Sequence, residues 1–116
     1  ANGIVTNEQT IRDRPALVRG FVRALRRGLL DALADPDLAF ETSKKFVEGL
    51  GNNPQNDEIQ RQVLLKSIAL WQSPAPGHTE PAAWEATQDV LLSMGLINAK
   101  IDPAQLYTNQ FVDDLQ

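Results

Sequence analysis

At four points along the chain, a residue able to cap a helix is followed within two positions by proline. The segments are Asp13-Arg14-Pro15, Asp35-Pro36, Asn53-Pro54 and Thr79-Glu80-Pro81. A polar side chain at the N-cap accepts a hydrogen bond from a free backbone N–H, and proline fits the first turn because its missing N–H has no intrahelical partner there. Apolar residues follow each segment at helical spacing. The pattern predicts four helices, over about 14–34, 36–50, 55–73 and 80–94.

Each predicted helix has an apolar stripe that we expect to face a core. In chain order the stripes consist of Leu17, Val18, Phe21, Leu25, Leu29 and Leu33; Leu38, Ala39, Phe46 and Leu50; Ile59, Val63, Leu64, Ile68 and Trp71; and Trp84, Thr87, Leu91 and Met94. Glycines at 49, 51 and 95 are typical of helix ends. The four proline starts are unevenly spaced, which argues against a helical repeat.

The first residues form the one β-like run of the sequence. The segment Asn2-Gly3-Ile4-Val5-Thr6 predicts a short N-terminal strand. A strand leaves backbone groups unsatisfied unless another strand pairs with it. We therefore expect its partner strands to lie in preceding sequence, and expect the chain by itself to fray there or to self-associate. The whole of 1–116 suits a single, mainly α-helical domain.

Composition excludes several kinds of function. The net charge of −4 argues against a nucleic-acid partner. The chain has no cysteine, so it has no disulfide, thiolate nucleophile or cysteine-bound zinc. No apolar stretch has the length of about 18–20 residues that a membrane helix needs.

Side chains that could serve as catalytic groups or metal ligands do not form a recognisable cluster in the sequence. His78 is the only histidine, and it lies in a proline- and glycine-containing loop two residues before Glu80. A general base needs a positioned partner, and a metal site needs more ligands than this loop supplies. Asp35 and Asp37 are explained by helix capping. We therefore predict no catalytic residue, no metal site and no cofactor.

A basic face and a few aromatic residues are the remaining candidates for binding. Six arginines surround the first helix, and they are interpreted as a solvated face more readily than as a contact for phosphate or an acidic partner. Trp71 and Trp84 lie on helical stripes, where tryptophan is usually part of a core. Trp71 ends its helix beside an irregular loop and is the better ligand candidate. Tyr107 and Asn109 are explained equally well by a tail that packs on its own domain. The arginines are Arg12, Arg14, Arg19, Arg23, Arg26 and Arg27.

Several segments together resemble a known family. Gly3-Ile4-Val5-Thr6-Asn7-Glu8, the helix start at Arg14-Pro15 and the following Asp35-Pro36 are similar to a recurrent stretch of bacterial solute-binding proteins. Tyr107-Thr108-Asn109-Gln110-Phe111 resembles the ending of the family that binds thiamine-pyrimidine precursors, with Gln110 where glutamate is usual. That family includes riboflavin-binding proteins and, as a divergent branch, enzymes that synthesise the thiamine pyrimidine.

The resemblance implies that the chain is the C-terminal part of a two-lobed α/β periplasmic-binding-protein fold. Its partners would be the upstream lobes of the same protein, a small heterocyclic ligand (a thiamine-pyrimidine precursor or riboflavin) and an ABC permease, in an extracytoplasmic location. The main binding residues would lie upstream. Asn7, at the expected strand end, and Trp71 are the residues here that we expect to touch ligand, if any do. The alternatives are part of a thiamine-pyrimidine biosynthesis enzyme and a free-standing helical interaction or regulatory module.

Overall fold

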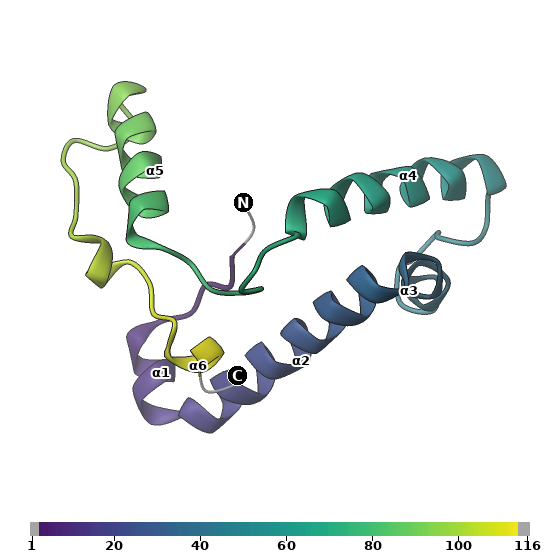
Figure 1. Ribbon diagram of the computed structural model, residues 1–116, viewed down its shortest axis with the longest axis horizontal. Helices are drawn as coiled ribbons and strands as arrows, with labels where there is room; N and C mark the ends of the chain where they lie inside the picture. Colours follow the sequence, from purple (N-terminus) through teal and green to yellow (C-terminus); the bar gives the residue numbers. More distant parts are fainter. Residues whose placement is uncertain (1–2, 114–116) are drawn as a thin grey trace. The chain divides into compact units, whose positions relative to one another are not determined.

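The computed structural model describes residues 3–113, and these are mainly α-helical, as predicted (Figure 1). No strand occurs among the described residues. The elements are α1 (Glu8–Asp13), α2 (Pro15–Ala34), α3 (Pro36–Ser43), α4 (Pro54–Trp71), α5 (Pro81–Ser93), the 3-10 helix η1 (Pro103–Gln105) and α6 (Gln110–Asp113).

The four predicted helices exist as α2 to α5, and each begins at its proline. Two of the four caps form as expected. The Asp35 carboxylate accepts from the backbone N–H of Leu38 at 2.9 Å, and the Asn53 side chain accepts from the first turn of α4. The other two differ, because Asp13 is the last residue of α1 and Glu80 makes no side-chain capping bond. Proline with an extended residue before it is therefore sufficient to start α5.

The predicted N-terminal strand is wrong over its described residues. Residues 3–7 are exposed and irregular, and Val5 is 94% accessible to solvent. A strand requires a second extended segment for its ladder, and the described chain supplies none. The chain instead enters α1 directly, since the Asn7 side chain caps it by accepting from the Thr10 N–H at 2.7 Å. The sequence predicted no helix where α1 lies.

The second predicted helix ends about two turns early, at Ser43. The Ser43 hydroxyl donates to the Ala39 carbonyl at 2.8 Å, a contact that weakens the helical ladder locally. The chain then continues in turns, with Lys45 and Phe46 donating to carbonyls three residues back. Phe46 is consequently 82% exposed instead of facing inward as predicted.

The described chain forms two compact units. The first combines residues up to Arg23 with those from Gly77 on, and the second is Ala24–Pro76. Because α2 runs from Pro15 to Ala34, it contributes its beginning to one unit and its end to the other.

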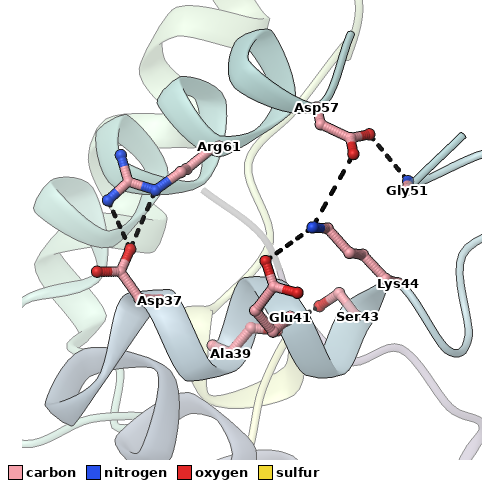
Figure 2. A network of polar contacts seen from close by, with 8 residues as sticks. All are labelled: Asp37, Ala39, Glu41, Ser43, Lys44, Gly51, Asp57 and Arg61. Carbon is pink, nitrogen blue, oxygen red and sulfur yellow. Dashed lines mark hydrogen bonds and ion pairs between the residues drawn. The ribbon is translucent and has the colours of Figure 1, made fainter. Parts of the chain in front are cut away.

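In the second unit α3 packs against α4, and one apolar residue of each helix is buried: Phe40 of α3 and Ile68 of α4. Figure 2 shows the polar contacts that join these helices. Arg61 of α4 donates to one oxygen of Asp37 of α3, from Nε at 3.0 Å and from Nη2 at 2.5 Å. This hydrogen bond, with the attraction to the carboxylate charge, raises the pKa of Arg61 above its ordinary value. Arg61 therefore keeps its charge at every pH at which proteins fold.

Asp57 fastens the turns between α3 and α4 (Figure 2). Its carboxylate accepts from the Gly51 N–H at 2.9 Å and lies 4.0 Å from the Lys44 ammonium, which also pairs with Glu41 at 2.7 Å. Gly51 has a φ of 92°, a conformation that side-chain-bearing residues rarely adopt. One carboxylate at the start of α4 thus fixes a ten-residue connection.

In the first unit, α5 is held to the segment that carries η1. The Gln88 amide is buried, donating to the Ile101 carbonyl at 2.9 Å and accepting from the Ile101 N–H at 2.7 Å. The helix ends in a Schellman motif, with Leu96 donating to the Leu91 carbonyl and Gly95 at a φ of 69°. The predicted stop at Gly95 is confirmed.

Burial of apolar side chains is sparse, and the predicted inward stripes are only partly right. The buried apolar residues of the described chain are Phe40, Ile68 and Phe111. Several stripe residues are exposed over half or more of their surface. They are Leu17, Phe21 and Leu25 of α2, Leu38 of α3, Ile59 and Val63 of α4, and Met94 directly after α5. Contiguous exposed apolar surface is characteristic of contact surfaces.

Two glycine substitutions are expected to act in opposite directions. Gly28→Ala, inside α2 with no atom near the added Cβ, should raise stability by up to about 1 kcal/mol because alanine favours the helix. Gly95→Ala should lower it by about 1–2 kcal/mol because φ is positive there. Thermal unfolding followed by circular dichroism measures both. A Gly95→Ala chain as stable as the unsubstituted one would contradict the Schellman stop.

Candidate functional site

The best-organised polar cluster joins the C-terminal segment to the loop before α5. Asn109 is its centre: its side-chain carbonyl accepts from the Thr79 N–H at 3.1 Å, and its side-chain NH₂ donates to the Thr79 carbonyl at 2.8 Å. A single side chain thereby satisfies both backbone groups of Thr79, in the way a neighbouring strand would. We call this pair of contacts the Asn109 clamp.

Two aromatic rings extend the clamp. The Trp84 indole donates to the Thr79 hydroxyl at 3.1 Å and stacks on Tyr107, with ring centroids 5.5 Å apart and an interplanar angle of 5°. Phe111, buried on α6, lies under the Arg19 guanidinium at 5.9 Å. Tyr107 and Asn109 thus fasten the tail to its own unit, one of the two interpretations that the sequence allowed. Trp84 has the structural role expected from its stripe.

His78 is half-buried beside the clamp. Its Nε2 is 2.9 Å from the Asn109 side-chain nitrogen and 3.7 Å from a carboxylate oxygen of Asp113, and its Nδ1 is 3.3 Å from Glu80. The ring therefore has more partners than an ordinary loop histidine. Over residues 3–113, however, no three histidine, cysteine or carboxylate side chains gather closely enough to hold a metal ion.

A shallow, open hollow of the second unit is lined by residues that directly follow Trp71 in the sequence, and we call it the hollow beside Trp71. Trp71 is half-buried at the end of α4. The residues that follow it meet the end of α2 in a shallow hollow of about 530 Å³. Aliphatic and proline side chains with two polar groups form its walls. The lining residues are Leu30, Leu33, Gln72, Ser73, Pro74 and Pro76.

Asn7, the other predicted ligand residue, lies in the first unit, and Trp71 lies in the second. The side-chain oxygen of Asn7 is engaged in capping α1. The sequence did not predict that role, because the expected strand placed Asn7 at a strand end. An Asn six residues before Asp13, followed at once by Glu8, is itself a helix-start signal that could have been recognised.

The basic face around α2 is partly paired within its own helix. Arg27 donates to both carboxylate oxygens of Asp31, at 2.9 and 3.1 Å, one turn further on. Arg12 pairs with Asp13 at 3.2 Å. Local pairing of this kind is what a solvated arginine face requires.

Removing the Asn109 clamp should measurably destabilise the chain. Asn109→Ala leaves both backbone groups of the half-buried Thr79 without their partner, and we expect a loss of about 1–3 kcal/mol and a Tm lower by several degrees. Asn98→Ala, at an exposed position, is the matched control and should change the stability by less than about 0.5 kcal/mol. Equal Tm values for the two variants would show that the clamp carries no stability.

Comparison with known proteins adds the following. Residues 1–39 match a family model described as NMT1/THI5 like. The chain is 41% identical over 119 aligned residues to the riboflavin-binding protein RibY of Chloroflexus aurantiacus, an alignment that covers 97% of this chain and 33% of RibY. No solved structure matches the chain. Within residues 3–113, no helix combines the length and apolar character needed to cross a membrane.

These matches agree with the family that the motifs indicated. The family-model match includes the Gly3–Glu8 segment and the proline starts at Pro15 and Pro36. The match to RibY extends through α3 to α6, although the chain spans only about a third of the length of that relative. The chain is thus a relative of the NMT1/THI5-like solute-binding proteins.

Proposed function

We propose that this chain is part of an ABC-transporter substrate-binding protein that captures a small heterocycle for uptake. The observation that carries the proposal is the 41% identity to a riboflavin-binding protein over nearly the whole chain. Identity at that level over α1 to α6 supports a shared fold and a shared general role. Riboflavin is the ligand class to test first, and thiamine-pyrimidine precursors are the second.

The geometry supports a shared binding site, to which this chain contributes one wall. High affinity for a small molecule needs a concave site that encloses most of the ligand. The hollow beside Trp71 is open, and the other surface depression lies along the exposed side of α4. In a two-lobed binding protein the remaining walls come from the other parts of the chain, which close around the ligand. RibY has about two thirds of its length outside the aligned region.

We propose that the same protein binds its ligand without converting it chemically. The relative is named for binding riboflavin, and the His78 cluster is occupied by contacts that fasten the tail. Delivery to an ABC permease and an extracytoplasmic location complete the proposal, and the family resemblance supports both. The enzymes of the thiamine-pyrimidine branch remain the alternative class.

Ligand binding should require the longer protein. We expect riboflavin to bind the full-length parent with micromolar or better affinity and to bind this chain alone at least about 100-fold more weakly, because most of the site is supplied by other segments. Isothermal titration calorimetry with riboflavin and a thiamine-pyrimidine precursor measures both. Comparable affinity for the isolated chain would contradict the shared site. Recovery of chemically unchanged ligand, checked by mass spectrometry, separates binding from enzymatic conversion.

Substitutions at the two candidate contacts should separate ligand binding from stability. In the parent, Trp71→Leu should weaken binding by about tenfold or more if the ring stacks on the ligand, whereas Trp71→Phe keeps an aromatic face and should weaken it less. Asn7→Ser keeps an N-cap oxygen for α1 but removes the amide. Weaker binding by Asn7→Ser with an unchanged Tm would identify Asn7 as a ligand contact. Unchanged affinity in all three variants would place the ligand elsewhere.

A further inference from the structure

The contacts around Asn109 fix which nitrogen of His78 carries the proton. The Thr79 N–H can only donate, so it faces the side-chain oxygen of Asn109, at 3.1 Å. The Asn109 NH₂ group therefore faces both the Thr79 carbonyl at 2.8 Å and the His78 Nε2 at 2.9 Å. Since an NH₂ group has no acceptor capacity, Nε2 of His78 must be the acceptor. The neutral ring then carries its hydrogen on Nδ1, which faces Glu80 at 3.3 Å.

This arrangement is compatible only with the neutral ring. A protonated ring carries a hydrogen on both nitrogens, so Nε2–H would point at the Asn109 NH₂ group across 2.9 Å. Two donors facing each other repel, and the contact cannot persist at that distance. A carboxylate that can replace it is already near, because an oxygen of Asp113 lies 3.7 Å from the same nitrogen.

The charged groups facing the ring favour that replacement. Among residues 3–113 they are Glu80, on the loop of His78 itself, and Asp113, on α6. Both side chains are carboxylates. On another element of this unit, the Arg19 guanidinium of α2 lies over the Phe111 ring. A positive ring therefore gains two attractions as it loses one neutral hydrogen bond.

We propose that protonation of His78 exchanges its partner, from the amide of Asn109 to the carboxylate of Asp113, and so re-sets α6 against the loop before α5. A charge-assisted N–H···O bond has a length of about 2.7–2.9 Å, so the 3.7 Å gap must close by nearly 1 Å. The Asn109 clamp on Thr79 does not use His78 and stays intact as the pivot. The exchange is therefore a response to acidification. The proposal is independent of the proposed ligand.

Nuclear magnetic resonance tests the exchange directly, since the chain has a single histidine. With ¹⁵N-labelled chain, the ring nitrogen shifts at pH 8 should show the Nδ1–H tautomer. Between pH 8 and pH 5, the Asn109 side-chain NH₂ resonances and the Asp113 backbone amide should move together with the ring. The proposal would be overturned by an Nε2–H tautomer at pH 8, or by Asn109 resonances that do not shift between pH 8 and pH 5.

Two variants distinguish partner exchange from a general effect of pH. In Asp113→Asn, the Asn109 resonances should still respond to the ring, whereas the response of α6 should be lost. In the matched Glu80→Gln variant, which keeps Asp113, both responses should remain. Loss of the α6 response in both variants, or in neither, would contradict the exchange. Thr79 amide hydrogen exchange serves as the folding control, because the clamp should protect it at both pH values.

Discussion

Three polar side chains of the described chain fix irregular connections by bonding to backbone groups 6, 13 and 30 residues away in the sequence. Asn109 reaches Thr79, Gln88 reaches Ile101, and Asp57 reaches Gly51. Asn109 and Asp57 lie where a tail or a helix meets an irregular connection, whereas Gln88 lies inside α5. Because few apolar side chains are buried, these contacts decide where the connections run. A half-buried backbone group without a partner is costly, which is why such side chains are effective at fixing a single path.

The same scarcity of buried apolar surface supports the functional proposal. The apolar sides of α2 and α4 are exposed in this chain. Such exposure is expected of helices that pack against another part of a larger fold. A relative three times as long, with 41% identity over this region, has the sequence to supply that surface. The open hollow beside Trp71 is consistent with a binding site whose other walls belong to other parts of a longer protein.

Helix starts were predictable from the sequence because caps and prolines act locally. Asp35 and Asn53 cap their helices as their positions indicate, and a helix begins at each of the four prolines from which a start was predicted. Helix ends and burial were less predictable. Phe46 fitted a stripe by spacing alone, but the helix stops at Ser43, so the stripe never reaches it. The predicted strand required partners that only tertiary structure can provide.

The polar anchors were largely missed for a related reason. Nothing in the residues around Gln88 indicates that its amide is buried against a segment thirteen residues away. Asn109 was recognised as a possible anchor of the tail, but its partner Thr79 was not. Asn7 and Trp71 stay predictions as ligand contacts. In the structure the Asn7 side chain caps α1, and the residues that follow Trp71 line a hollow.

The double contact between Gln88 and Ile101 makes the intervening connection a segment of fixed length. The amide must meet an N–H and a carbonyl of the same residue, so a one-residue insertion or deletion between Gly95 and Ile101 would present groups of a different residue to Gln88. An added residue would have to loop outward to be tolerated. Length variation in relatives of this chain is therefore expected to be concentrated away from the connection that follows α5.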